Sequence, residues 1–130
     1  MTSPWDQGNE CVASYSFAAT AALECRYWIK TKQLVRLSVQ NLIDCSQSQG
    51  NQGCASGTVN SAFQYVKDRR GINTDQDYPY VGSAEDVCSF NSSSAIARVA
   101  YFVDVPVSEL DLQLAVANKG VITVDVDASR

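Results

Sequence analysis

Residues 11–25 read CVASYSFAATAALEC, a pattern typical of a buried helix that begins in a polar turn. Apolar side chains recur at three- and four-residue steps, which predicts one buried helical face consisting of Phe17, Ala18, Ala21, Ala22 and Cys25. We expect Ser14 to cap the first turn. The start of a helix carries unpaired N–H groups and the positive end of the helix dipole, so an oxygen there is stabilised as it gains negative charge. Ser14 is therefore a candidate nucleophile.

The composition predicts one soluble globular domain. The chain has 130 residues, 45% of them hydrophobic, which is enough for a sizeable core. Its net charge of -4, with ten scattered Lys and Arg residues, argues against nucleic acid or an anionic membrane as a partner. No apolar run approaches the roughly 20 residues of a membrane-spanning helix, and residues 1–4 do not resemble a signal peptide. We expect no leader or pro-segment in this sequence.

The five cysteines indicate disulfides rather than a metal site, because they lack the close Cys-x-x-Cys pairs of zinc-binding proteins. We therefore expect neither a metal nor a cofactor. Any four of these cysteines can pair in three ways, and the spacing alone does not choose among them. Cys25 lies on the predicted apolar face, where a free thiol acts as a small hydrophobe.

Further elements follow from the same patterns. Ser38 is expected to cap a second helix with Val39, Leu42 and Ile43 on one face. A third helix is predicted from the spacing of Val59, Ala62, Phe63 and Val66, and it ends in basic residues before Gly71. Residues 108–118 predict a short fourth helix. Two alternating runs, 99–103 and 121–126, are typical of strands, and we expect residues 101–105 and 121–126 to expose apolar surface because they lack partner strands.

The first segment also carries a family resemblance. Residues 11–18 resemble the papain and cathepsin L active-site segment Cys-Gly-Ser-Cys-Trp-Ala-Phe-Ser, with Ser14 standing where the nucleophilic cysteine belongs and Val12 in place of the usual glycine. Ala13-Ser14-Tyr15 is similar to the silicateins, cathepsin-L-like proteins of sponge silica filaments. Residues 38–45 are similar to the family's Ser-Glu-Gln-Asn-Leu-Val-Asp-Cys. Residues 71–74 and 77–80 resemble its Gly-Ile-Asp-Thr and Ser-Tyr-Pro-Tyr signatures.

The resemblance implies an α+β papain-like fold. Residues 1–98 then form the helical N-terminal domain, and residues 99–130 form the beginning of the β-rich C-terminal domain. The implied disulfides join Cys11 to Cys54 and Cys45 to Cys88. The resemblance covers about the first half of a mature family member. We therefore expect the C-terminal half of the fold to be a partner of this chain.

The resemblance also implies further site residues. Gln7 is a candidate donor to an oxyanion, although it precedes Ser14 by seven residues where the family's glutamine precedes its nucleophile by six. Ser56, Gly57 and Thr58 stand where the family lines its substrate cleft with Gly-Gly-Leu, so Ser56 replaces the first glycine. Hydroxyl side chains there would suit silicic acid, and Ser or Thr at a helix start also acts simply as a cap.

A serine nucleophile needs a base, and the chain contains no histidine. The family's His and Asn lie in its β-rich domain, so this chain holds half a site. Three functions remain open. They are silica condensation or silicon alkoxide hydrolysis at Ser14, a non-catalytic role in structure or filament assembly by self-association, and, more weakly, a cathepsin-L-like peptidase acting on peptide. The resemblance implies a secreted protein, in an extracellular or lysosome-like compartment. There, Asn91-Ser92-Ser93 would be an N-glycosylation sequon.

Overall fold

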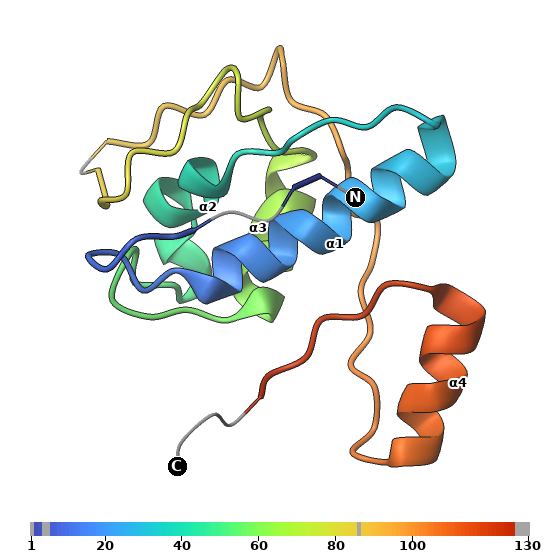
Figure 1. The fold of residues 1–130 in the computed structure, drawn as a ribbon. Coiled ribbons are helices and arrows are strands. Elements are labelled where there is room, and N and C mark those ends of the chain that lie inside the picture. Colours follow the sequence, from blue (N-terminus) through green and yellow to red (C-terminus); the bar gives the residue numbers. More distant parts are fainter. Residues whose placement is uncertain (1, 4–5, 86, 127–130) are drawn as a thin grey trace.

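The computed structural model describes residues 2–3, 6–85 and 87–126, and within these ranges the regular structure is helical. The elements are α1 (Ser14–Thr31), α2 (Val39–Cys45), the short 3-10 helix η1 (Gln47–Gln49), α3 (Val59–Arg69) and α4 (Glu109–Lys119), as Figure 1 shows. The helices predicted around residues 38–45, 59–66 and 108–118 are confirmed. None of the helices in the described ranges is long and apolar enough to cross a membrane.

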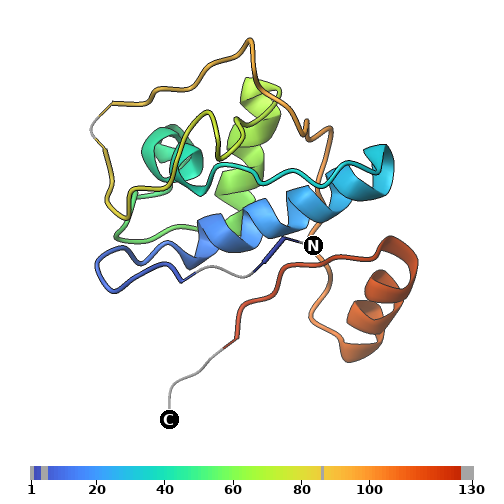
Figure 2. The same cartoon turned by 45° about the horizontal axis from the view of Figure 1, so that its top comes forward.

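Helix α1 is the centre of the core and packs against both α2 and α3 (Figures 1 and 2). The buried apolar side chains come from all three helices and from the segment after α3. They include Tyr15, Ala19 and Leu23 of α1, Leu42 and Ile43 of α2, Ala62, Tyr65 and Val66 of α3, and Ile72. Burial of this one cluster holds the beginning of α1 in a fixed orientation.

The buried face of α1 differs from the predicted one. Of the five residues expected to be buried, only Ala22 is; Phe17, Ala18, Ala21 and Cys25 are half-buried. The helix instead buries a polar stripe whose groups are hydrogen-bonded. The Ser16 hydroxyl donates to the Val39 carbonyl at 2.8 Å, and a Glu24 carboxylate oxygen accepts from the Leu37 N–H at 2.8 Å. Polar side chains with such partners are buried at little cost, and apolar periodicity does not detect them.

The expectation that Ser14 caps α1 is wrong. The capping position is Ala13, whose side chain makes no cap hydrogen bond, and its carbonyl accepts from the Ser16 and Phe17 N–H groups at 2.9 and 3.3 Å. Ser14 is the first residue of the helix itself. Its hydroxyl is therefore not used to close the first turn.

The other helices begin as the sequence predicts, at hydroxyl side chains. Ser38 accepts from the Asn41 N–H at 2.9 Å, and Thr58 accepts from the Ser61 N–H at 3.1 Å. Each bond satisfies one of the N–H groups that a helix start leaves unpaired. Helix α3 ends at Arg69, and its C-cap is Arg70, which is in the left-handed conformation with φ 60° directly before the predicted Gly71.

The strands predicted at residues 99–103 and 121–126 do not form in the described part of the chain. The β pairing found there is limited to two isolated bridges, Leu37 with Thr74 and Ile72 with Ile96. A strand requires a neighbour for its backbone hydrogen bonds, and neither run has one among the described residues. The expected exposure of apolar side chains is confirmed, since Tyr101 is 77% and Val126 is 78% exposed.

Helix α4 lies apart from the three packed helices in both views (Figures 1 and 2). It buries none of its side chains. It is tied to the body by a bond from the Arg26 guanidinium to the Lys119 carbonyl at 3.0 Å, and the segment before it by a bond from Asn60 to Asp104 at 2.8 Å. The division at residue 98 stays a prediction.

Candidate active site

Ser14 begins α1 and is exposed, directly after the buried Ala13. Two links fix the chain in front of it. The Cys11–Cys54 disulfide joins this segment to the loop before α3, and the Val12 N–H donates to the Cys54 carbonyl at 3.0 Å. The exposed hydroxyl thus stands at the positive end of an 18-residue helix, on a backbone that cannot easily shift.

Both disulfides are the pairs that the resemblance implies, Cys11 with Cys54 and Cys45 with Cys88. Each joins residues 43 positions apart. In the chain-entropy account, closing a loop of that size lowers the conformational entropy of the unfolded chain. The corresponding stabilisation of the folded state is roughly 4 kcal/mol for each disulfide. Cys25 is free and half-buried.

The residue after Ser14 connects the site to the predicted cleft wall. The Tyr15 hydroxyl donates to the Gly53 carbonyl at 2.9 Å, and burial raises the pKa of Tyr15 to about 12, so the phenol stays protonated at neutral pH. A Cβ added at Gly57 would lie 2.6 Å from the Tyr15 ring and 2.7 Å from Asn51 Oδ1. Residues 56–58 therefore pass directly over Tyr15, beside the start of α1.

Asn51 holds this wall in place. It is buried, its Oδ1 accepts from the Thr58 N–H at 2.8 Å, and its Nδ2 donates to Ser46 Oγ at 2.8 Å. The hydroxyl groups of Thr58 and Ser56 differ in whether they are free to contact a substrate. The Thr58 hydroxyl caps α3 and donates to Ser61 Oγ at 3.0 Å, whereas Ser56 is an exposed residue of the wall. Sequence reasoning missed Asn51, which stands in a polar loop with no distinguishing motif.

Gln7 is placed by its backbone. The Tyr80 hydroxyl donates to the Gln7 carbonyl at 2.7 Å, and the Tyr80 ring packs edge-on against Phe17 of α1 at 5.3 Å between centroids. Gln7 also lines a hollow of about 360 Å³ with Gly8 and Asn9. This hollow does not include Ser14, so a role of the Gln7 amide at an oxyanion stays a prediction. Pro4 and Trp5, which precede it in the family-like segment, lie outside the described residues.

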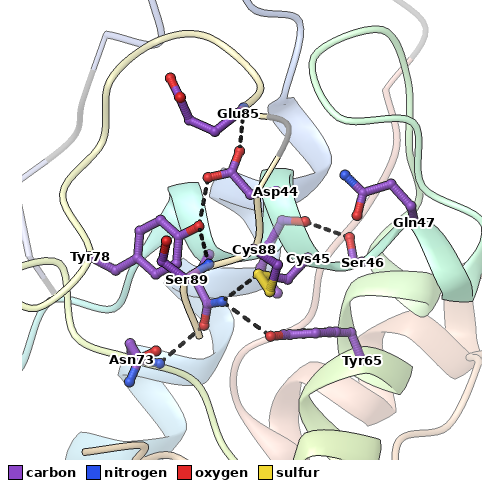
Figure 3. Close-up of a disulfide and its surroundings, with 12 residues drawn as sticks. Asp44, Cys45, Ser46, Gln47, Tyr65, Asn73, Tyr78, Glu85, Cys88 and Ser89 are labelled. Carbon is purple, nitrogen blue, oxygen red and sulfur yellow. Dashed lines mark hydrogen bonds between the residues drawn. A yellow bond between two sulfur atoms is a disulfide. The ribbon is translucent and has the colours of Figure 1, made fainter. Parts of the chain in front are cut away.

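A second hollow, of about 450 Å³, has Asp44, Tyr78 and Ser89 in its lining. Figure 3 shows these three side chains around the Cys45–Cys88 disulfide. The inner wall of this hollow is a saturated polar cluster around the buried Asp44. The Asp44 carboxylate accepts from the Tyr78 hydroxyl and from the Glu85 N–H, each at 2.8 Å. The Tyr78 oxygen in turn accepts from the Ser89 N–H at 3.2 Å, and burial raises the pKa of Tyr78 to about 12.

The hydrogen bonds of Asp44 attach the chain after Tyr78 to α2. Both carboxylate oxygens of Asp44 accept hydrogen bonds, one from the Tyr78 hydroxyl and the other from the Glu85 N–H and from Gln40 Nε2, the last at 2.8 Å. Asp44 therefore holds residues 78–85 onto α2. Among the described residues there is no group of three or more His, Cys, Asp or Glu side chains that could hold a metal ion.

Comparison with known proteins identifies the family. The family model described as papain family cysteine protease matches residues 1–130. The chain belongs to the papain family. It is 42% identical over 124 residues to procathepsin L of Felis catus and 44% identical over 125 residues to a cathepsin L-like peptidase of Aedes aegypti, each match covering 95% of this chain.

Solved papain-family structures agree with the fold. A digestive procathepsin L 3 from the larval midgut of Tenebrio molitor matches 87% of this chain with a TM-score of 0.80 and 41% identity. The Amb a 11 cysteine protease of ragweed pollen, in its proform, matches 90% with a TM-score of 0.81 and 36% identity. The papain-like fold is thus established, in its cathepsin-L-like form. The chain spans 36 to 37% of the length of these curated relatives.

Proposed function

We propose that this chain is the nucleophile-bearing part of a silicatein-like catalyst, in which Ser14 attacks silicon. In a silicon alkoxide, a bond forms between Ser14 Oγ and silicon, the bond from silicon to the alkoxide oxygen breaks, and the serine proton leaves with the alcohol. Water then displaces the serine to give a silanol. In silica condensation Ser14 Oγ bonds to the silicon of silicic acid, and one hydroxyl leaves as water with the serine proton. The oxygen of a second silanol then displaces the serine to form the Si–O–Si bond, and its proton returns to Ser14.

The exposed Ser14 hydroxyl at the start of α1 is the observation that carries this proposal. The helix dipole favours the negative charge that develops on Oγ as its proton is removed. A base must remove that proton, and the sequence contains no histidine. The proposal therefore requires a His and an orienting Asn from the remainder of the fold, which the papain-family relatives are long enough to hold.

The cleft wall supports a small substrate over a peptide. Ser56 is exposed on the wall, where a hydroxyl can accept from or donate to a silanol. Gly57, the next residue of the wall, packs closely against the Tyr15 ring, which fixes the backbone beside Ser56. A cathepsin-like peptidase remains the weaker alternative, because the close relatives include peptidases while Val12, Ser14 and Ser56 all depart from the family's active-site pattern.

A specific observation favours a second function, structural assembly without catalysis. Exposed apolar side chains cover α4 and the segments on either side of it, among them Val103, Leu110 and Val124. Such a surface is suited to self-association or to contact with the rest of the fold. The two disulfides support a secreted, extracellular or lysosome-like location under either function.

The test joins this chain to the C-terminal region of a cathepsin L relative, which supplies the His and Asn. With a silicon alkoxide, release of molybdate-reactive silicic acid should be at least tenfold faster for the wild type than for Ser14→Ala. Equal rates would reject catalysis by Ser14 and leave the assembly function. A Ser14→Cys variant of the same chimera, active on a peptide substrate, serves as the control that the joined fold is intact.

The chain without that region should show neither peptidase nor silica-condensing activity above its own Ser14→Ala variant. Hydrolysis of a fluorogenic peptide and precipitation of silica from silicic acid measure the two activities. A reproducible difference between wild type and variant would mean that this chain contains a base of its own.

A further inference from the structure

Asn91, Ser92 and Ser93 form an exposed surface loop that the proposed function does not use. The loop carries the Asn-x-Ser sequon, and no other asparagine of the sequence is followed two positions later by Ser or Thr. A sequon is modified only where the asparagine can reach the transferase and where a bulky sugar can be carried without disturbing the core.

A buried side chain anchors the backbone of this loop. Asn73 is 1% exposed, its Nδ2 donates to the Asn91 carbonyl at 2.8 Å, and its Oδ1 accepts from the Asn91 N–H at 3.0 Å. The two bonds with Asn73 thus fix the main chain of Asn91 to the core, while Asn91 itself is an exposed residue. A sugar attached to this side chain would displace no buried group.

The contacts of the Asn91 carboxamide involve its oxygen. The N–H and the hydroxyl of Ser93 both donate to Asn91 Oδ1, at 3.0 and 2.7 Å. These bonds leave the nitrogen Nδ2, the atom that carries an N-linked glycan, uninvolved. The hydroxyl two residues on is the group that defines the sequon, and here it contacts the carboxamide directly.

We propose that Asn91 is an N-glycosylation site of this protein, an inference that is independent of what Ser14 does. The donor is a lipid-linked oligosaccharide of the pyrophosphate class. A bond forms between Asn91 Nδ2 and the anomeric carbon, the bond from that carbon to the pyrophosphate oxygen breaks, the lipid pyrophosphate departs and the amide nitrogen loses one proton. No oxidation or reduction takes place.

The position of the loop keeps the glycan away from the candidate active site. In Figures 1 and 2 the chain around residue 91, yellow to orange, runs on the opposite side of α2 from the start of α1. Glycosylation is therefore compatible with access to Ser14.

The test expresses the full chain behind a cleavable signal peptide in eukaryotic cells, and total lysate and medium are both analysed. Wild type should run as a larger species that collapses on treatment with peptide N-glycosidase, and release in heavy-oxygen water should mark Asn91 as labelled aspartate. Asn91→Gln and Ser93→Ala should abolish the shift. The matched control Ser92→Ala keeps the sequon and should keep the glycan, whereas Ser92→Pro should lose it.

Transfer occurs while the chain enters the secretory compartment, so a variant that fails to fold still reports its glycan in the lysate. A wild-type chain whose mass matches the bare polypeptide would overturn the proposal. So would a glycan that persists in Asn91→Gln, since it would then sit on another residue. Ser93→Thr should give occupancy at least equal to wild type.

Discussion

Ser14 and Lys30 lie at opposite ends of α1, and both are exposed. The dipole of the helix should therefore lower the pKa of a thiol at position 14 and raise that of a thiol at position 30. We expect Ser14→Cys to react with iodoacetamide about tenfold faster than Lys30→Cys near neutral pH, corresponding to roughly 1.4 kcal/mol. Peptide mapping by mass spectrometry measures both rates.

The native Cys25 provides an internal reference in each of these variants, because it is free and half-buried. Its alkylation should be equal in the two proteins. If the two introduced thiols react at the same rate, the start of α1 does not activate a nucleophile, and the proposed role of Ser14 loses its electrostatic basis.

Gly57 is required because a larger side chain would not fit there, and not because of its backbone conformation. Its φ lies outside the left-handed region, while an added Cβ would overlap the Tyr15 ring. Gly57→Ala should destabilise the fold by about 1–3 kcal/mol in urea unfolding followed by circular dichroism. In a Tyr15→Val background, which removes the ring, the same substitution should cost clearly less.

Gly8→Ala is the matched control for backbone strain, because Gly8 has φ +77° and an added Cβ there would meet nothing within 4 Å. Its cost should be the same with or without the Tyr15 ring. An equal cost of Gly57→Ala in both backgrounds would show that the cleft wall does not rest on Tyr15.

Tyr78 makes the stability of the fold sensitive to alkaline pH. Burial raises its pKa from 10.0 to about 12, so the folded state holds the phenolic proton more tightly than the unfolded state. The resulting stability is present in full below pH 10 and is lost as pH rises from there to about 12. Urea midpoints across this range should fall more steeply for wild type than for Tyr78→Phe, and parallel curves would contradict the assignment.

Among the elements, the helix starts show how much local sequence determines. Ser38 is a cap as predicted, because a cap needs only a hydroxyl and the N–H three residues on, and Thr58 and Ser108 make the same bond at the starts of α3 and α4. The buried face of α1 could not be predicted, since Ser16 and Glu24 are buried through bonds to Val39 and Leu37, which lie far along the chain. The network around Asp44 has the same origin.

The capping residues Ser38 and Ser108 should differ in how much they contribute to the stability of the fold. The buried Ser38 hydroxyl accepts from Asn41 and donates to the Tyr78 carbonyl at 2.6 Å, whereas Ser108 starts an exposed helix that buries nothing. Ser38→Ala should therefore cost about 2–3 kcal/mol of unfolding free energy. Ser108→Ala should leave the main unfolding transition unchanged. Equal effects in urea titrations would mean that α4 unfolds together with the core.

At the scale of the whole molecule, the extended segments explain why the strand predictions failed while the family assignment held. The alternation at residues 99–103 is real, yet a strand forms only when a neighbour accepts its hydrogen bonds. Residues that would pair with it are not among those described. The family resemblance rested on short motifs at residues 11–18, 38–45, 71–74 and 77–80, which lie in or next to the three packed helices, so it did not depend on such partners.

Helix α4 also carries apolar side chains on its exposed surface. Leu110 and Leu114, which are 63% and 50% exposed, lie one turn apart on one face. Replacing both with Lys should reduce binding of a hydrophobic dye and self-association severalfold, because the face loses its apolar contacts while lysine keeps the helix. Dye fluorescence and sedimentation velocity measure the two effects.

The matched control adds the same two charges elsewhere on α4, as Gln113→Lys with Ala117→Lys, both at exposed positions. If the two pairs act alike, net charge rather than the apolar face governs association. If only the leucine pair reduces association of the chain, the apolar face is responsible. Joining the chain to the C-terminal region then distinguishes the two roles of that face. A surface that this region covers should lose dye binding in the joined protein, whereas a surface built for filament assembly should keep both dye binding and self-association.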